Sequence, residues 1–384
     1  MIEFHEAREL AHAAGMTAEP ATESLPIAEA AGRVLAADLL ATQPIPAFAS
    51  SAMDGWAVRG DGPWSLGAPI AAGDRPTTEP LEPGTARPIS TGAPVPPDAD
   101  RVLRSERGEI DDGGLKALAT DGGNIRPAGE EAAAGALLLP AGTRLSPAAI
   151  ALAAVAGRDD VEVLVRPTVD LVVLGNEVID AGEPPTGLVR DAYTPALPAA
   201  LARLGLAHER STRVGDSLDL TIAALRESTA DLVITTGGTA HGTADHLHEA
   251  LAILDAHLII DGVRMRPGHP VLLARLPFGT LVLGLPGNPF AAYVALSTLG
   301  AALADGMLHR EIAPLATSRL AVDVPWTGSS TRVAAARTGA TGLTPTDHQG
   351  AGMLRGLAAA DCLCVVPPGG ALAGDRVETI AVPW

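Results

Sequence analysis

The chain has 384 residues, of which 47% are hydrophobic, 3% are aromatic and 19% are charged. Its 27 Lys and Arg residues against 45 Asp and Glu residues give a net charge of −18, which excludes nucleic acids and anionic membranes as general partners. No apolar run reaches the roughly 20 residues that span a bilayer, and the acidic N-terminus lacks a signal-peptide pattern, so we expect a cytoplasmic protein.

The N-terminal part contains three segments with helical character. HEARELAHAAG at 5–15 is amphipathic and predicts a helix. SLPIAEAAGRVLA at 24–36 predicts a second short helix with Ser24 as its cap. TRLSPAAIALAAVAG at 143–157 predicts a third helix, because Ser146 is followed by a proline, which suits the first helical position.

A β-rich segment separates the second and third of these helices. It is rich in Gly, Pro and Asp, and it contains short alternating stretches such as ARPISTG and RVLRSE. Short alternating stretches between turn residues are typical of strands in a small β domain. We therefore expect this segment to be inserted into the helical region as a unit of its own.

The middle of the chain alternates strand and helix. TVDLVVLG, DLVITTGG and TLVLGLPGNP predict buried strands, and the segments beginning DAYTP, DSLDL, TADHL and FAAYV predict the intervening helices. Such alternation predicts a parallel sheet with helices on both faces, that is, a doubly wound α/β domain. Ligands of such sheets bind at the carboxyl ends of the strands.

The last part of the chain returns to short strands, SRLAVDVPW, STRVAAART, CLCVVPP and VETIAVPW, which predict a small β-barrel. Cys362 and Cys364 lie two residues apart in one of these strands, where a disulfide would be strained, so we expect free thiols. The chain is thus predicted to be a multidomain α/β plus β protein. The expected domains are a discontinuous helical and extended domain of residues 1–45 and 136–166, a β-rich inserted domain of residues 46–135, an α/β domain of residues 167–313 and a β-barrel of residues 314–384.

Three loops follow strands of the predicted α/β domain, where a ligand is expected. Glycines in TTGGTAHGTADHL free the backbone to approach an anion at a helix start, although glycine can also simply turn the chain. The pattern matches neither the Walker A motif nor G-x-G-x-x-G, so nothing indicates a kinase or a nicotinamide enzyme. The candidate residues in LGNEVID, TTGGTAHGTADHL and GLPGNPFAAY are Glu177, Gly237, Gly238, Gly242, Asp245, Asn288 and Pro289.

Polar clusters also stand at Gly-Pro turns outside these three loops. VRMRPGHPVLL presents Arg264, Arg266 and His269, which can grip an oxyanion or form a solvated hairpin. FASSAMDGWAVR presents Asp54 in a turn, which is either an ordinary surface connection or a displayed carboxylate. The inserted segment adds Thr91, Arg126, Glu130 and Glu131, where an acid beside an arginine can be a weak surface ion pair.

These motifs occur together in an order that resembles one family. PAFASSAMDGWAV, STGAPVPPDADRVL, NIRPAGEEAAAGALLLPAGTRLSPAAIALAAVAG, DLVITTGGTAHGTADHL, VRMRPGHPVLL, GLPGNPFAAYVAL and GAGMLRGLAAADCLCVVP follow one another as in molybdopterin molybdenumtransferases. This is the MoeA family, which includes the E domain of gephyrin. The resemblance covers nearly the whole chain, and it implies a molybdopterin-binding type of α/β domain.

The resemblance implies a reaction in molybdenum cofactor biosynthesis. Adenylylated molybdopterin and molybdate, the second substrate, yield molybdenum cofactor and AMP with Mg²⁺. It implies that Glu177 and Asp245 hold the metal. It further assigns the acidic and polar active-site positions to Asp54, Thr91, Arg126, Glu131, Glu177, Asp216 and Asp245, and the molybdate part to Arg266, Pro267, His269, Pro286 and Pro289.

The resemblance also implies a homodimer in which the site is shared between subunits. The loop carrying the Met-Asp-Gly turn of one subunit would meet the α/β domain of the other, so Asp54 would complete the site in trans. It suggests molybdopterin adenylyltransferase as a further protein partner. An adenylyltransferase reading of this chain itself would leave its two β-rich segments unexplained.

Several family residues are replaced in this chain. The usual serines, lysine and acid of the ligand loops give way to Thr236, Ala240, Thr243, His269, Ala291 and Ala351, and Asn176 and Glu131 stand where aspartates are customary. Each lost hydroxyl or ammonium group removes about 1–3 kcal/mol of anion binding if its partner is left unpaired. The alternative function is therefore a weakened paralogue that carries molybdopterin nucleotide or acts as a scaffold without turnover.

Overall fold

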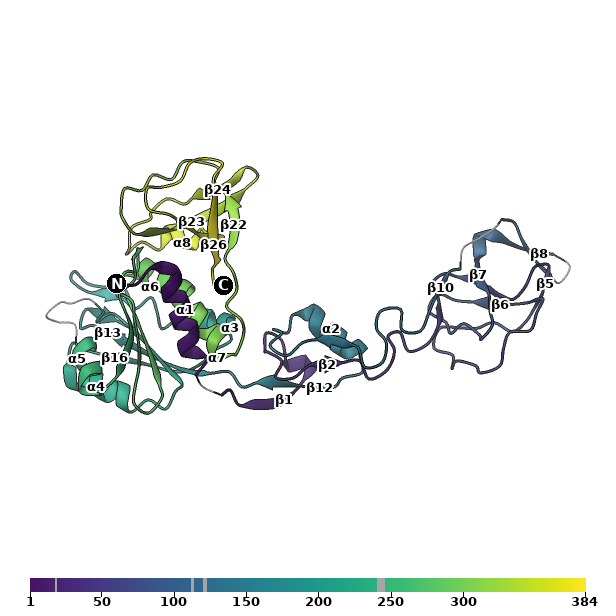
Figure 1. The fold of residues 1–384 in the computed structure, drawn as a ribbon, viewed down its shortest axis with the longest axis horizontal. Helices are drawn as coiled ribbons and strands as arrows, with labels where there is room; N and C mark the ends of the chain where they lie inside the picture. The colour runs from purple at the N-terminus through teal and green to yellow at the C-terminus, as the bar shows by residue number, and fades with distance from the viewer. Residues whose placement is uncertain (18, 112–113, 120–122, 240–245) are drawn as a thin grey trace.

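The protein is elongated, with a large body at one end and a small lobe at the other (Figure 1). This computed structural model describes residues 1–17, 19–111, 114–119, 123–239 and 246–384. The chain starts in the body, runs out along a narrow arm to the far lobe, and returns along the arm. Both termini lie in the body, which contains an α/β domain and a C-terminal sheet.

A six-stranded mixed sheet forms the centre of the α/β domain, in the order β16-β13-β17-β21-β20-β18. The first four strands are parallel, as predicted, whereas β20 and β18 are antiparallel to their neighbours. The expectation of a wholly parallel sheet is wrong at this edge, because the short link 276–280 between β20 and β21 cannot make the crossover that parallel pairing requires. The strands are β13 (Thr168–Leu174), β16 (Ala207–Val214), β17 (Leu232–Thr236), β18 (His257–Asp261), β20 (Leu272–Arg275) and β21 (Leu281–Leu285).

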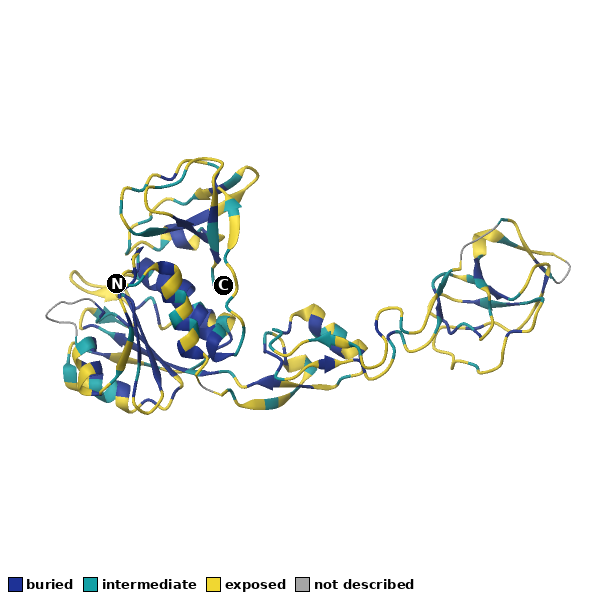
Figure 2. Ribbon diagram, in the orientation of Figure 1, coloured by how far each residue is buried: buried dark blue, intermediate teal, exposed yellow. Residues whose placement is uncertain are grey.

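Helices cover both faces of this sheet. Alternate residues of β13 enter different cores, since Leu171 belongs to one buried cluster and Val172 to the other. Figure 2 shows the buried residues concentrated along the sheet and the helices packed on it. The helices of the first cluster are α1 (Phe4–Gly15), α3 (Leu197–Leu204), α6 (Pro289–Ala295) and α7 (Ala301–Met307), and those of the second are α4 (Leu218–Arg226) and α5 (Leu247–Ile253).

One continuous apolar helix runs through the body as α6, the π-helical segment η3 (Leu296–Gly300) and α7. By length and composition this segment, Pro289–Met307, could cross a membrane, but 89% of its most apolar window is buried inside the protein. Helix α1 packs on it closely, because a Cβ atom at Gly306 would lie 2.1 Å from the backbone oxygen of His12. It therefore has the burial of a core helix of a globular domain.

The arm is built from antiparallel strand pairs and one helix. β1 (Thr22–Pro26) pairs with β12 (Asp160–Leu164), and β2 (Leu39–Leu40) pairs with β11 (Leu137–Leu139). Helix α2 (Pro147–Val155) is confirmed, with the Ser146 hydroxyl accepting the first-turn N–H at 3.2 Å.

The helix predicted at 24–36 is wrong. Its first residues form β1 in the arm, and only Ile27–Glu29 make a single 3₁₀ turn. Pro26 would lie in the first turn of that helix, where proline is tolerated, so it does not by itself exclude the helix. Pairing of β1 with β12 satisfies the backbone instead.

The far lobe is β-rich, as the sequence predicts, and its sheet has the order β7-β4-β6-β5-β9-β8. The chain enters and leaves it through neighbouring residues, because Ile45 N–H donates to the Ala132 oxygen at 2.8 Å. The domain boundaries of the sequence analysis stay predictions. The strands of the lobe are β3 (Ser50–Ser51), β4 (Gly55–Val58), β5 (Trp64–Leu66), β6 (Thr85–Ile89), β7 (Arg101–Arg104), β8 (Gly108–Asp111), β9 (Gly114–Ala117) and β10 (Ile125–Arg126), with the 3₁₀ turn η2 (Ser105–Arg107).

The C-terminal sheet has the order β19-β23-β25-β26-β22, with β24 paired to β23. Closure into a barrel stays a prediction. Cys362 and Cys364 are free, and burial raises the pKa of the Cys364 thiol to about 11. The elements are β19 (Met265–Arg266), β22 (Ala316–Arg319), β23 (Thr331–Gly339), β24 (Gly342–Pro345), α8 (Arg355–Ala358), β25 (Cys362–Val366) and β26 (Arg376–Ala381); two short strands, β14 (Val178–Ile179) and β15 (Val189–Arg190), pair beside the α/β sheet.

Candidate functional site

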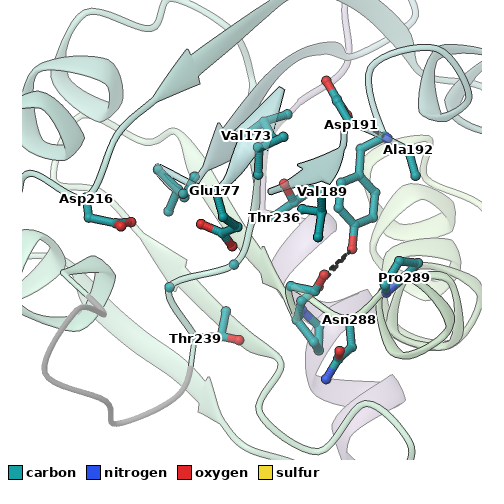
Figure 3. A pocket seen from close by; sticks show the side chains of 18 of the residues that line it. Val173, Glu177, Val189, Asp191, Ala192, Asp216, Thr236, Thr239, Asn288 and Pro289 are labelled. Carbon is teal, nitrogen blue, oxygen red and sulfur yellow. Dashed lines mark hydrogen bonds between the residues drawn. The ribbon is translucent and has the colours of Figure 1, made fainter. Parts of the chain in front are cut away.

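A cavity of about 650 Å³ opens at the carboxyl ends of the four parallel strands, and we name it the carboxylate cavity. Each of these strands ends in a loop that contributes to the wall, as expected where parallel strands end together. Figure 3 shows Glu177, Asp216, Thr239 and Asn288 around it. The predicted residues on its wall are Glu177, Asp216, Gly237, Gly238, Pro286, Asn288 and Pro289.

The glycines after β17 shape this cavity through their backbone. Gly237 and Gly238 have φ of +93° and +70°, which side-chain-bearing residues rarely adopt. A Cβ atom at Gly238 would also lie 3.0 Å from a methyl carbon of Leu174. The sequence pattern therefore predicted the turn correctly. Gly242 and Asp245 lie outside the described residues, as do the substituted Ala240 and Thr243.

Three carboxylates lie on the wall, those of Glu177, Asp191 and Asp216, and the first and last of these differ in their partners. Asp216 is tied to Asn176, whose N–H donates to Asp216 Oδ2 at 3.3 Å, while Asp216 N–H donates back to Asn176 Oδ1 at 3.2 Å. This pair joins the ends of β13 and β16. Among the described residues, Glu177 has no hydrogen-bond or ion-pair partner for its carboxylate. Glu177 is thus available to a ligand.

Two wall residues were missed by the sequence analysis. Tyr193 donates its hydroxyl hydrogen to the Gly287 oxygen at 2.7 Å, and burial raises the pKa of this hydroxyl. Burial alone would raise the pKa of Asp191, but hydrogen bonds from Thr194 and Tyr193 outweigh it and hold the pKa below the usual value. The Asp-x-Tyr-Thr sequence, typical of an Asp-capped turn, is the signal that could have identified them.

A second cavity, of about 450 Å³, lies beside the first and faces the C-terminal sheet. We name it the arginine cavity. Both cavities share Pro270, Pro286 and Asn288 on their walls. No Asp or Glu stands among the described residues that line it. The predicted residues Arg266, Pro267 and His269 line it, and so do Trp326, Arg332 and Gln349, which the sequence analysis did not single out.

His269 is held towards its neutral form in this cavity. Burial lowers the pKa of the imidazole, and the nearby Arg266 guanidinium lowers it further. An oxyanion would reverse the second effect, because it favours the protonated ring. Binding of an anion and protonation of His269 are therefore expected to support one another.

The remaining predicted residues lie far from both cavities within one chain. Asp54 Oδ1 accepts hydrogen bonds from the Thr91 backbone N–H at 2.7 Å and hydroxyl at 3.0 Å, and these bonds lower the pKa of the carboxyl. Both residues stand in the far lobe, with Arg126 on β10 and Glu131 beside the neck of the lobe. The structure thus brings Asp54 to Thr91 but does not bring it to Glu177 in the same chain.

The donor set of the carboxylate cavity suits a hard divalent cation in part. Within the described ranges, no three His, Cys, Asp or Glu side chains group closely enough to hold a metal by themselves. Mg²⁺ commonly takes only one or two protein carboxylates and completes its shell with water and substrate phosphate. The free carboxylate of Glu177 fits that requirement, and the second predicted ligand, Asp245, lies outside the described part of the chain.

Comparison with known proteins matches three family models along the chain. Residues 2–157 match "MoeA N-terminal region (domain I and II)", residues 170–305 match "Probable molybdopterin binding domain", and residues 323–382 match "MoeA C-terminal region (domain IV)". Molybdopterin molybdenumtransferase 2 of Mycobacterium tuberculosis (strain CDC 1551 / Oshkosh) is 33% identical over 294 residues, covering 71% of this chain and 72% of that protein. The Staphylococcus aureus (strain MSSA476) molybdopterin molybdenumtransferase is 30% identical over 371 residues, covering 90% and 88%.

A solved structure shares the whole architecture. The molybdopterin biosynthesis MoeA protein from Pyrococcus horikoshii OT3 superimposes with a TM-score of 0.83 at 21% identity, covering 99% of this chain and 100% of that one. At this identity the match supports the fold alone. The family models and the curated relatives decide the assignment: the chain belongs to the MoeA family of molybdopterin molybdenumtransferases.

Proposed function

We propose that this protein inserts molybdenum from molybdate into adenylylated molybdopterin and releases AMP. The observation that carries the proposal is the shared wall of the two cavities, one lined by carboxylates and the other by cations. A phosphate-bearing substrate with its metal needs the first environment, and a small dianion needs the second. Their adjacency allows both substrates to meet.

The chain's own groups would hold the nucleotide end in the carboxylate cavity. The loop after β17 presents its backbone at Gly237 and Gly238, where no side chain keeps a phosphate away. We assign the Mg²⁺ ligands to Glu177 and Asp245. Bound there, Mg²⁺ would offset the negative charge of the phosphates and of the leaving AMP. Asp216 keeps the adjoining strand ends together through Asn176.

The arginine cavity would hold molybdate. Arg266 and Arg332 both line it, and neither guanidinium has a carboxylate partner within the described part of the chain. On a chain of net charge −18, two unpaired arginines facing one cavity form a local site for an anion. Pro286, Pro289 and Asn288 lie where the two substrates would approach each other.

The far lobe would act on the partner subunit. Asp54 is exposed, is held by Thr91 and is kept ionised by those hydrogen bonds. We propose that a homodimer brings the Asp54 carboxylate to the carboxylate cavity of the second subunit. Arg126 on β10 and Glu131 at the neck of the lobe would accompany it. Because the substrate arrives adenylylated, a molybdopterin adenylyltransferase must act earlier, and direct transfer from it is proposed.

A second candidate function is a carrier of molybdopterin nucleotide without turnover. The observation that favours it is the wall of the arginine cavity, where Ala291 and Ala351 present methyl groups in place of the family's serine hydroxyls. His269 stands in place of a lysine and is largely neutral. Each replacement removes a donor that an oxyanion could use, so the cavity has fewer donors than the family pattern.

One assay separates the two functions. Purified protein is incubated with adenylylated molybdopterin, Mg²⁺ and molybdate, and AMP is measured against time. The transferase is supported if AMP release requires molybdate, is abolished by a chelator and is abolished in Glu177→Gln and Asp245→Asn. Asp180→Asn is the matched control, because Asp180 is exposed, pairs with Arg213 at 3.6 Å and does not line the cavity. Tight nucleotide binding without AMP release at any molybdate concentration would support the carrier instead.

A further inference from the structure

Two arginines of the arginine cavity lie side by side although they are far apart in the chain. Arg266 stands on β19, which lies between β18 and β20 in the chain but belongs to the C-terminal sheet, and Arg332 stands on β23 of the same sheet. The two strands pair in parallel, with Arg266 directly opposite Arg332. In-register residues on neighbouring strands project from the same face about 5 Å apart. Positive charges carried at such neighbouring positions repel each other, and an anion bound between the two side chains offsets that repulsion.

Trp326 holds one of these arginines. The Arg332 guanidinium carbon lies 5.6 Å from the centre of the indole ring, within the range of a cation–π contact. A hydrogen bond from Arg332 Nη1 to the Pro325 oxygen, at 3.1 Å, fixes the same side chain from the adjoining residue. Arg332 thus stays at the cavity without the carboxylate that would otherwise neutralise it.

Several contacts fix the position of the Trp326 indole ring. Its Nε1–H donates to the Ser330 oxygen at 2.6 Å, across a turn of the same loop. A Cβ atom at Gly328 would lie 2.4 Å from the six-membered part of the ring, so only glycine permits this turn to close over it. The ring also packs against the buried cluster of the C-terminal sheet that contains Val324. These contacts fix the indole without using the ring contact to Arg332.

We propose that Trp326 is a positioning residue of the arginine cavity, which seats Arg332 beside Arg266 so that the pair grips one tetrahedral oxyanion. This inference rests on the proposed use of the cavity for molybdate. It gives the cavity a source of affinity that does not depend on the missing hydroxyl and ammonium donors. It also makes the oxyanion a link between two distant chain segments, the one between β18 and β20 and the one that forms β23, since each supplies one arginine.

Molybdate titration by calorimetry on the full chain tests the role of Trp326. We expect Trp326→Leu, which keeps apolar bulk but removes the aromatic face, to weaken molybdate binding about fivefold to thirtyfold. Trp326→Phe keeps an aromatic face and is expected to stay within about threefold of the wild type. Trp384→Leu is the matched control, because Trp384 contacts Tyr293 and does not line the arginine cavity. The affinity of this variant for molybdate should equal that of the wild type.

A double-mutant cycle separates positioning from a merely structural role. If Trp326 acts through Arg332, Trp326→Leu should weaken binding by less than about twofold when Arg332→Gln, which removes the cation, is already present. The same factor in both backgrounds, or binding by Trp326→Leu within about twofold of the wild type, would overturn the inference while leaving the proposed function intact. Failure of the wild-type protein to bind molybdate would overturn both. Thermal unfolding and circular dichroism of each variant show whether the fold is retained.

Discussion

Mixing two inactive variants should restore activity if the site is shared between subunits. Asp54 directly precedes β4 of the far lobe and Glu177 follows β13 of the body, and these two parts lie at opposite ends of the long axis (Figure 1). In a heterodimer of Asp54→Asn with Glu177→Gln, one trans site receives both lesions and the other receives both native carboxylates. Each isolated heterodimer should therefore have about half the wild-type activity, and a random mixture about a quarter.

The measurement uses two affinity tags on co-expressed chains, followed by the molybdate-dependent AMP assay. Each parent homodimer is expected to lose about a hundredfold or more, as removal of a catalytic carboxylate commonly does. The matched control pairs Glu177→Gln with Asp216→Asn. Both residues line the same cavity of one chain, so every site in that heterodimer carries a lesion and activity should stay low. A heterodimer of Asp54→Asn with Glu177→Gln as inactive as its parents would refute the reasoning.

Three further predictions concern single residues. Because His269 has a lowered pKa, molybdate affinity should increase about tenfold as pH falls below 6.5 and the ring becomes protonated, and a calorimetric pH series that is equally steep in His269→Gln would contradict this. Tyr193→Phe removes the 2.7 Å hydrogen bond to Gly287 and should lower the free energy of unfolding by about 1 kcal/mol; an unchanged urea midpoint and slope would disprove it. Ser146→Ala removes the cap of α2 and should lower the free energy of local unfolding of that helix by about 1 kcal/mol. Amide hydrogen exchange in α2 should then be faster than in the wild type, while exchange in α1 stays unchanged.

The sequence predicts best what is locally determined. The strand at 168–174 is recognisable because its apolar residues fall on both alternating faces, so both faces have to be buried. The glycine turn after β17 is recognisable because positive φ requires it. The general location of the carboxylate cavity then follows from parallel strands ending at one edge of the sheet. Those predicted residues of the three loops that the structure describes do line this cavity.

Features that depend on distant pairing were not predictable in this way. Residues 24–36 have helical composition, but β1 lies against β12 from more than a hundred positions away, and that pairing decides the outcome. Trp326 looks like one apolar residue before a Gly-Ser turn. Its contact with the arginine cavity arises because β19, which lies between β18 and β20 in the chain, pairs with β23 of the C-terminal sheet. The role of Asp54 in a shared site came from the resemblance, since nothing within one chain brings it to the cavity.

The neck of the far lobe has a consequence for how such proteins can diversify. Ile45 and Ala132 are hydrogen-bonded to each other, so the chain enters and leaves the far lobe at adjacent residues. The segment between Ile45 and Ala132 can be lengthened, shortened or exchanged without changing the strand register of the arm. The two ends that such a segment has to join are already adjacent. The far lobe can accordingly be replaced by one of another size or surface that suits a new partner, while the residues of the body that line the two cavities stay the same.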